Sequence, residues 1–430
     1  MSLLPVHRYH SPVTSDAIDR GAYPAGVMSP WRGRLTVLVA VAFVGLNARV
    51  MVAVVSLIVN LIRADVPLTS GDVGILGLAA PLCFSVFGAM APWFGRRYGL
   101  EATIIAALLI TSLGEVGRAS ATSPAWFIAW TVPALAGAGM GNVIAPPLIK
   151  KYFPDRVTVV TTVYTVFTTL STSLPPLLIL RIAQATGWRF SVRVWAVVGL
   201  CGVIPWAMIV FHSDRAGQRL AAIKRRLDPR TLVPRPAALS VPLWRTSVAW
   251  GLTATFAVNC VIGYTMFAWL PQMLQDAGVT VAHSDFLLAV FASGSLPGAL
   301  LTPWLIAHVR PTWVLPAVFT VAYAVSFTML MLHPGQSTLL WLLVSRIGDC
   351  YFAYTITMIN LRTRTTRGSI RLSGFVQPLA YAIACVGPWG FGLLHTATGA
   401  WHVPMVAILA CLPVQLVGGV IVARSKPVDV

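Results

Sequence analysis

Twelve apolar stretches of about twenty residues each constrain this chain more than any other feature of its sequence. A helix rises about 1.5 Å per residue, so about twenty apolar residues cross the roughly 30 Å hydrocarbon core of a bilayer. The stretches cover residues 35–61, 72–93, 101–120, 125–148, 157–181, 191–211, 246–270, 284–307, 313–333, 338–360, 372–395 and 401–423. Only 10% of the residues are charged, whereas soluble domains average about 25%. The sequence therefore predicts an all-α membrane protein with twelve transmembrane helices.

The apolar stretches form two groups of six, and the groups repeat one another. The pair Pro-Trp at 92–93 recurs at 303–304, and Asn47 and Asn259 occupy similar places in the two groups. A basic, proline-containing stretch separates the groups. We therefore expect a tail at 1–34, a first half at 35–211, a central loop at 212–245, a second half at 246–423 and a short tail at 424–430.

The positions of the 31 lysine and arginine residues predict the orientation of the helices. With a cytoplasmic N-terminus, 24 of them lie in cytoplasmic segments and five lie outside, while Arg49 and Arg346 lie within predicted helices. Cytoplasmic loops of membrane proteins carry such an excess, so we expect both termini in the cytoplasm. This asymmetry accounts for the net charge of +18 without a nucleic-acid partner.

Motifs for catalysis and nucleotide binding are missing from the sequence. It has no phosphate-binding Gly-Lys-Ser/Thr loop, no metal-ligand spacing and no nucleophile triad. The six cysteines fall in apolar segments without a Cys-x-x-Cys pair, so we interpret them as packing residues. We therefore expect no enzyme activity, no cofactor and no bound metal.

Three segments carry motifs of a known transporter family. Residues 141–156 read GNVIAPPLIKKYFPDR, residues 264–278 read YTMFAWLPQMLQDAG, and residues 372–401 read LSGFVQPLAYAIACVGPWGFGLLHTATGAW. They resemble the cyanate/nitroimidazole (CynX/NimT-type) family of major facilitator transporters, and the resemblance extends over residues 35–423. Two places depart from it: NARV at 47–50 lacks the proline of the family motif, and RIGDCYFAY at 346–354 carries two charges in a helix that is often rich in Gly and Gln.

The resemblance implies the major facilitator fold, in which two pseudo-symmetric six-helix halves rock around a site at the bilayer midplane. It also implies a monomeric secondary transporter of a bacterial cell membrane. In that fold the first, fourth, seventh and tenth helices line the central cavity, with contributions from the fifth and eleventh. The partners implied are a small-molecule solute and the lipid bilayer, with protons as an open question.

Arg49 is the one charged residue between positions 35 and 61, near the middle of the first predicted helix. A charge at that depth costs at least about 3 kcal/mol on insertion scales, and such residues are usually functional. One interpretation is a structural charge neutralised by a neighbouring helix. The other is a binding residue in a water-filled cavity, where its planar fork of donors suits an anionic or polar planar solute.

Arg346 and Asp349 are three residues apart in the tenth predicted helix, so they share a face. They form either an internal ion pair or a proton-coupling site in which Asp349 takes up and releases a proton. Asp349 is interpreted as the only carboxylate deep in any helix. Glu115 and Arg118, near the outer end of the third helix, are expected to form a surface pair.

Neutral polar residues complete the candidates for solute binding: Asn47, Asn142, Asn259, Tyr264, Gln377 and Tyr381. Each could instead make an interhelical hydrogen bond, worth about 0.6 kcal/mol. Gly88, Gly95, Arg96 and Arg97 occupy the place of the facilitator loop between the second and third helices. We interpret them as a conformational gate; the alternative is plain positive charge on the cytoplasmic side.

The predicted function is secondary transport of a small anionic or polar planar solute. Two alternatives stay open: a multidrug-type exporter of the same fold, and a membrane sensor that binds solute without moving it.

Overall fold

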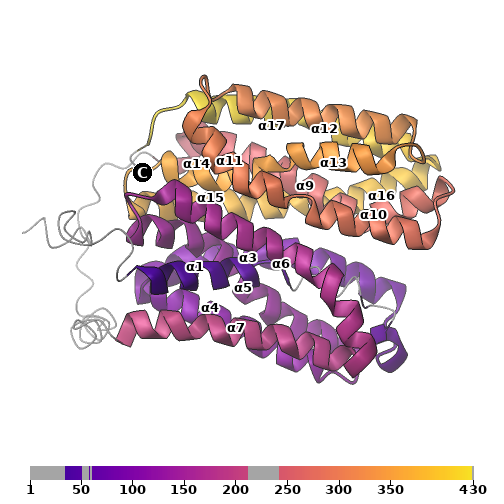
Figure 1. Ribbon diagram of the computed structural model, residues 1–430, viewed down its shortest axis with the longest axis horizontal. Helices are drawn as coiled ribbons and strands as arrows, with labels where there is room; N and C mark the ends of the chain where they lie inside the picture. The colour runs from indigo at the N-terminus through magenta and orange to yellow at the C-terminus, as the bar shows by residue number, and fades with distance from the viewer. Residues whose placement is uncertain (1–33, 51–57, 59–60, 212–241, 429–430) are drawn as a thin grey trace, which may run out of the picture.

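The computed structural model describes residues 34–50, 58, 61–211 and 242–428. The first half contains α1 (Leu35–Asn47), α3 (Ser70–Tyr98), α4 (Leu100–Ala119), α5 (Pro124–Tyr152), α6 (Val157–Thr186) and α7 (Trp188–Phe211). The second half contains the short η3 (Leu243–Arg245), α9 (Ser247–Asp276), α10 (Val281–Ser293), α11 (Leu296–His308), α12 (Val314–Leu332), α13 (Thr338–Gly348), α14 (Cys350–Leu361), α15 (Thr366–Ala384), α16 (Val386–Thr398) and α17 (His402–Arg424). The two halves lie side by side, indigo to magenta below and red to yellow above (Figure 1).

Eleven apolar helical spans in the described residues are long enough to cross a membrane, and α1 adds a shorter apolar helix. They match the twelve predicted stretches one for one, so the twelve-helix membrane fold is confirmed. The first stretch is described only over 35–50, 58 and 61, so most of its second half cannot be compared. Nearly all of the predicted N-terminal tail, residues 212–241 of the central loop and residues 429–430 lie outside the described residues.

Local sequence signals place several helix boundaries. Thr69 closes a capping box with Asp72 at the start of α3, and the Ser123 side chain accepts a hydrogen bond from the Trp126 amide at the start of α5. Between α3 and α4 stands the single residue Gly99 at φ 95°, and between α6 and α7 stands Gly187 at φ 88°. Glycine suits these turns because it adopts positive φ without steric cost.

Three spans of the second half consist of two helices in tandem. The breaks fall at 294–295 between α10 and α11, at Asp349 between α13 and α14, and at Cys385 between α15 and α16. In the first half, α1 ends at Asn47, and Ala48 and Arg49 form a bend. Irregular backbone inside a membrane is tolerated where it is buried in protein or lines a cavity. These four breaks therefore indicate where the interior is polar.

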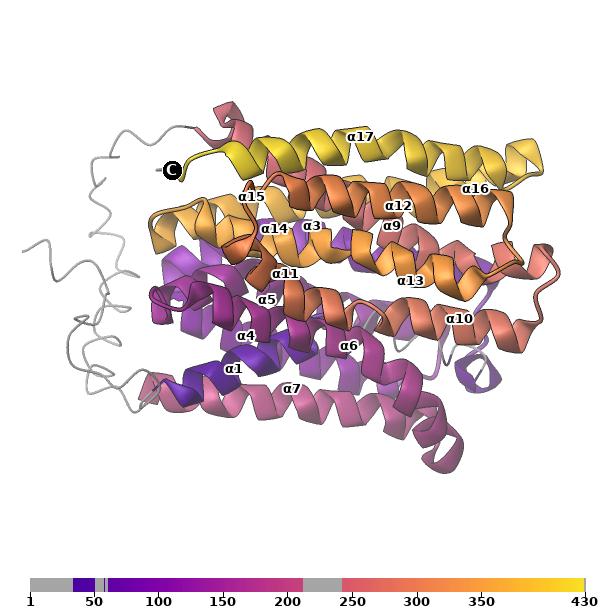
Figure 2. The ribbon, with the colours of Figure 1, turned by 45° about the horizontal axis from the view of Figure 1, so that its top comes forward.

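The two ends of the bundle differ in how the halves meet. We call the end at which α1 begins and α17 finishes the termini end, and the opposite end the far end (Figure 2). At the termini end Lys150 Nζ lies 2.9 Å from Asn360 O and 2.9 Å from Thr363 Oγ1. Deeper in the same interface Ser373 Oγ donates to Val143 O at 2.8 Å. The halves are thus joined by hydrogen bonds from the termini end toward the middle.

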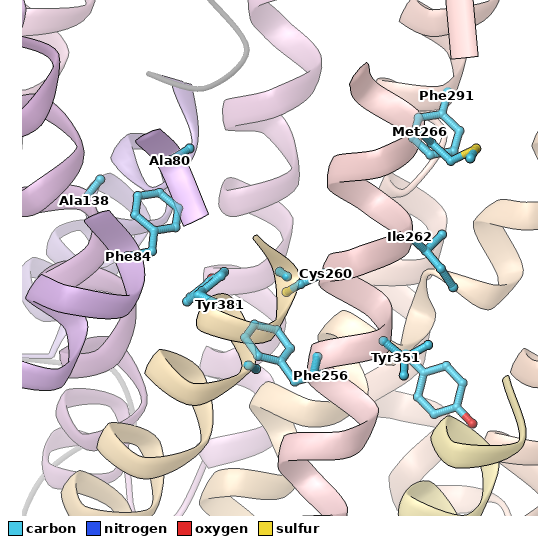
Figure 3. Packing of buried hydrophobic residues seen from close by; sticks show 14 of the residues in the cluster. Ala80, Phe84, Ala138, Phe256, Cys260, Ile262, Met266, Phe291, Tyr351 and Tyr381 are labelled. Atoms are coloured by element: carbon cyan, nitrogen blue, oxygen red, sulfur yellow. The ribbon is translucent and has the colours of Figure 1, made fainter. Parts of the chain in front are cut away.

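Aromatic packing closes the interface above these hydrogen bonds. Figure 3 shows Phe84 of α3 and Phe256 of α9 beside Tyr381 of α15. The ring of Tyr381 lies 5.2 Å from that of Phe84 and 5.4 Å from that of Phe256, both edge-to-face. Such pairs add about 0.5–1.5 kcal/mol beyond the area they bury. This cluster joins the two halves and forms the floor of the cavity described below.

Candidate solute-binding site

A cavity of about 750 Å³ lies between the two halves. Its walls come from α3, α4, α5 and α6 of the first half and from α9, α10, α13, α14 and α16 of the second. Trp389, Arg63 and Gln272 line it near the far end and are exposed, Trp389 by 62%. Toward the termini end the path is closed by Tyr381, Gln377 and Asn142, each at most 3% exposed. Among the described residues the cavity is therefore open toward the far end and closed toward the termini end.

Charge in the cavity wall is strongly unbalanced. Four arginines of the described chain line it: Arg49, Arg63, Arg118 and Arg346. Asp349 is the one acidic residue of the lining among the described residues. Opposite charges attract more strongly where water is partly excluded. The lining therefore favours a negatively charged or electron-rich solute.

Arg49 reaches the cavity from the bend after α1. Its Cζ lies 4.4 Å from the ring centroid of Phe352, which supports the guanidinium from one face. Its Nε is buried without a hydrogen-bond partner, and no ion pair is formed with it among the described residues. The structural alternative needs a locked partner, and the described chain supplies only the Phe352 ring. Arg49 thus brings a positive charge to the cavity wall without an ion-pair partner in the described chain.

Arg346 is held from several sides at the end of α13. Its Cζ stacks 3.5 Å from the ring centroid of Phe291, and its Nη1 donates to Phe291 O at 3.2 Å. Nη1 also lies 3.3 Å from Ser295 Oγ and 3.6 Å from Asp349 Oδ2. Its 8% exposed side chain is therefore fixed in place, in contrast to Arg49.

Asp349 occupies the break between α13 and α14 and is surrounded by donors. Ser295 Oγ donates to its Oδ2 at 2.6 Å, and Asn259 Nδ2 donates to its Oδ1 at 3.3 Å. The Tyr323 hydroxyl lies 3.0 Å from Asn259 Oδ1 and 3.5 Å from Asp349 Oδ1. Hydrogen bonds of this kind favour the ionised carboxylate. The break in the helix therefore places the Asp349 carboxyl among donors and beside Arg346.

The rest of the lining combines hydroxyls on one side with aromatic rings on the other. Thr168, Thr169 and Thr172 of α6 line the cavity, and each hydroxyl donates to a carbonyl one turn earlier. Their oxygens keep lone pairs free to accept a further hydrogen bond. The aromatic lining residues are Tyr264, Phe267, Trp269, Phe291, Phe352 and Trp389. Flat apolar walls with a few fixed polar groups are typical of sites for small organic molecules.

The structure divides the sequence candidates into two groups. Arg49, Asn259, Tyr264, Arg346 and Asp349 come together in the cavity wall. The other four lie elsewhere, as follows.

Asn142 accepts from the Tyr164 hydroxyl at 3.1 Å, and its backbone carbonyl accepts from Gln377 Nε2 at 3.2 Å. Tyr381 packs in the aromatic floor. Asn47 donates to Phe43 O at 2.9 Å within its own helix. In this conformation Asn142, Gln377 and Tyr381 join helices, Asn47 bonds within α1, and none of the four lines the cavity.

Comparison with known proteins identifies the family to which this architecture belongs. The model of the Major Facilitator Superfamily matches residues 37–388. The chain belongs to the Major Facilitator Superfamily. It is 27% identical to the uncharacterized transporter YycB of Bacillus subtilis (strain 168), over 90% of this chain and 94% of that protein.

Two further relatives are transporters of small solutes. The 2-nitroimidazole transporter of Escherichia coli (strain K12) is 25% identical over 92% of this chain and 98% of its own length. The cyanate transport protein CynX of the same organism is 22% identical over 84% and 90%. Among solved structures, the proton:xylose symporter XylE superposes with a TM-score of 0.68 at 12% identity, covering 92% of this chain and 95% of that one. The expected family and fold are confirmed, and the chain is a secondary transporter of a bacterial cell membrane.

The predicted gate residues of this facilitator lie at the termini end of α3. A Cβ on Gly88 would lie 3.1 Å from Val143 Cγ2, and a Cβ on Gly95 would lie 3.2 Å from Ile144 Cδ1, so both glycines let α3 approach α5 closely. Arg96 and Arg97 are exposed.

The guanidinium of Arg97 lies over the rings of Trp93, at 5.3 Å, and Tyr98, at 5.7 Å. Neither arginine forms an ion pair within the described part of the chain. At this end and in the closed interface the hydrogen bonds that join the halves come from Lys150, Ser373 and Gln377. Two more join the halves along α6, where Thr165 donates to Ala299 O and Ser173 donates to Ala292 O.

The prediction for Glu115 and Arg118 was wrong. Both are 0% exposed, since α5 and α7 cover this part of α4, and Arg118 lines the cavity. The related inference, that Asp349 is the only deep carboxylate, is wrong for the same reason. Sequence reasoning also missed Ser295, Tyr323 and the threonines of α6; the i, i+4 spacing of Thr168 and Thr172 was the available signal.

One acidic residue at the far end shows a clear electrostatic perturbation. Trp188 Nε1 donates to Asp65 Oδ2 at 2.9 Å, and Arg189 pairs with the same oxygen. These hydrogen bonds, the one from Trp188 first, hold the pKa of Asp65 below its ordinary value. Asp65 therefore links the loop before α3 to the start of α7 through its charged carboxylate.

Proposed function

We propose that this facilitator carries a small planar organic anion through the cavity between its halves. The observation that carries the proposal is the charge of the cavity wall, which contains four arginines and one acidic residue, Asp349, among the described residues. Arg49 adds a guanidinium that is stacked on Phe352 and has a donor without a partner among the described residues. A guanidinium fork matches a carboxylate or nitro group in two parallel hydrogen bonds.

Size and shape narrow the class of solute. A cavity of about 750 Å³ lies in the range of sites for organic molecules, about 300–1,000 Å³, and exceeds what a triatomic anion such as cyanate needs. Aromatic rings such as Tyr264 and Phe267 offer flat faces to a ring, and the α6 threonines offer acceptors to its polar substituents. The relative that is named a 2-nitroimidazole transporter handles a flat, polar ring.

The sidedness of the cavity follows from the charge asymmetry of the loops. With both termini in the cytoplasm, the open far end faces outward and the hydrogen bonds of Lys150 and Ser373 close the cytoplasmic side. Rocking of the halves would break these bonds and close the far end. In this cycle Asp349 acts as the internal partner of Arg346, and the chain works as a monomer.

The test compares three ring compounds of one shape and different charge: benzoate, benzamide and benzamidinium. Equilibrium binding and thermal stabilisation of the purified protein are measured for each, with 2-nitroimidazole and cyanate alongside. We expect stabilisation by benzoate, weaker stabilisation by benzamide and 2-nitroimidazole, and none by benzamidinium. A preference for benzamidinium would refute the proposal and favour the multidrug exporter, because an arginine-rich wall repels cations.

A further inference from the structure

Glu115 is the most unusual carboxyl group in the described chain. It lies on α4, is 0% exposed, and neither carboxylate oxygen has a hydrogen-bond partner among the described residues. A buried ionised carboxylate without donors costs several kcal/mol, and the group avoids this cost by taking up a proton.

Two other carboxyl groups within the membrane spans of the described chain are treated differently by the fold. Glu101, on the same helix, accepts hydrogen bonds from Lys151 and Tyr152. Asp349 accepts from Ser295 and Asn259. Both therefore have donors that stabilise a negative charge, and Glu115 alone of the three lacks them.

The neighbours of Glu115 on α4 connect it to the cavity. Arg118 follows at i+3, so it shares the face of Glu115, and it lines the cavity. Ser112 precedes at i−3, is 2% exposed, and its hydroxyl has no partner in the described part of the chain. A Cβ on Gly199 of α7 would lie 2.2 Å from Ser112 Oγ and 3.1 Å from Asn47 Oδ1, so this glycine makes room for polar groups. Ser112, Glu115 and Arg118 thus form a row of polar side chains along α4 that ends at the cavity wall.

Arg118 is not the only titratable group near Glu115, because the helices packed against α4 carry others. The helices in question are α3, α5 and α7. Their charged or titratable side chains are Asp72, Cys83, Arg96, Arg97 and Tyr98 on α3, Lys150, Lys151 and Tyr152 on α5, and Arg189, Arg193 and Cys201 on α7. All three residues of α5 lie at its end, and every α3 residue in this list except Cys83 lies at an end of α3. On α7, Arg189 pairs with Asp65 and Arg193 is exposed. Arg118, one turn along the same face of α4, is therefore the charged neighbour of Glu115 among these groups.

We propose that Glu115 holds a proton in this conformation and that, through Arg118, this proton and the anion in the cavity favour each other's binding. The inference rests on the proposed function, because it needs an anionic solute. It assigns the coupling proton to Glu115 in place of Asp349.

The coupling follows from charge balance. When Glu115 releases its proton, the O–H bond breaks, the electron pair stays on the carboxylate, and the proton passes to water in the cavity. The new negative charge is stabilised by the positive charge of Arg118. An anion in the cavity that Arg118 lines offsets that positive charge, so the carboxylate becomes less stable and the proton stays on. By thermodynamic reciprocity the protonated state binds the anion more tightly.

Infrared spectroscopy of the full-length protein in lipid nanodiscs tests the protonation directly. A protonated carboxyl group has a C=O stretch that an ionised carboxylate lacks. We expect this band near neutral pH in the wild type, its loss in Glu115→Gln, and its survival in the matched controls Glu101→Gln and Asp349→Asn. A wild type without the band, or a band that disappears in Asp349→Asn and persists in Glu115→Gln, would overturn the proposal.

Two further readouts test the connection to Arg118 and to the cavity. In D2O the Glu115 band should shift to lower frequency within minutes, since water in the cavity can exchange the proton; an unshifted band would contradict the proposal. In Arg118→Gln, a mimic of the anion-neutralised state, the band should persist to a pH about one unit or more higher than in the wild type, whereas Arg118→Lys should stay close to the wild type. An unchanged titration in a folded Arg118→Gln protein would refute the coupling.

The band is recorded without solute. Failure of benzoate to bind would therefore refute the proposed function, and absence of the band would refute this inference.

Discussion

Replacing Arg49 by alanine removes a guanidinium that touches few partners in the described chain. Its loss ends the contact with the Phe352 ring, 4.4 Å from Cζ, which is worth about 0.5–2 kcal/mol. Against this, the variant no longer buries an Nε that lacks a hydrogen bond, which costs about 1–3 kcal/mol. The two effects nearly cancel, so we expect the stability of the unliganded protein to change by less than about 1 kcal/mol.

Binding should respond very differently. A hydrogen bond to a charged group contributes about 1.5–3 kcal/mol. Loss of one such bond to benzoate therefore weakens binding by about 2 kcal/mol or more, which is about 30-fold in Kd. Arg49→Lys keeps the charge and loses the planar fork, so it should bind with intermediate affinity.

The assay measures thermal unfolding and benzoate affinity on the same preparations. Arg63→Ala is the control for general charge, because Arg63 is exposed at the far end of the same cavity. We expect it to change affinity by less than threefold, about 0.6 kcal/mol. Destabilisation of Arg49→Ala by about 3–5 kcal/mol would instead reveal a buried charge partner. Unchanged affinity in a folded Arg49→Ala protein would refute the role of Arg49 in binding.

Three further variants test separate parts of the structure. Asp349→Asn should lower thermal stability, because Arg346 loses the charge 3.6 Å away, yet leave any pH-driven uptake in place; loss of that uptake in a stable variant would return the proton to Asp349. Lys150→Met removes the hydrogen bonds to Asn360 O and Thr363 Oγ1 of the opposite half, so it should raise the access of a water-soluble thiol reagent to the closed end of the cavity. Equal labelling of the variant and the wild type would show that these bonds do not hold the end closed. Asp65→Asn should slightly lower the melting temperature at neutral pH. The lowered pKa of Asp65 means that its stabilisation is present above the ordinary carboxyl range and is lost below about pH 4, so the two melting temperatures should converge in acid; a constant difference would show that charge is not involved.

The sequence predicts the fold well because the membrane imposes a simple length rule. Spans such as Leu100–Ala119 and His402–Arg424 agree with the predicted stretches within about two residues. The breaks at Asp349 and Cys385 were not predicted. A break depends on whether neighbouring helices offer partners for the freed backbone groups, and that information is not local in the sequence.

The candidate site was only partly predictable. Arg49, Arg346 and Asp349 were recognised because a charge in an apolar stretch stands out. Asn142 and Gln377 lie instead in the closed interface, where residues that a family motif groups together bond the two halves. Glu115 was taken for a surface residue because it lies near a helix end, but coverage by α5 and α7 is a property of the assembled bundle.

Counterflow in proteoliposomes tests the central claim most directly. Vesicles containing the wild-type protein are loaded with unlabelled benzoate and diluted into a trace of labelled benzoate, so that exchange through a transporter accumulates label transiently without any ion gradient. We predict accumulation above that of empty vesicles, abolished by Arg49→Ala. A wild-type protein that binds benzoate and yet shows no counterflow would contradict the account and would identify a sensor in place of a transporter of this anion.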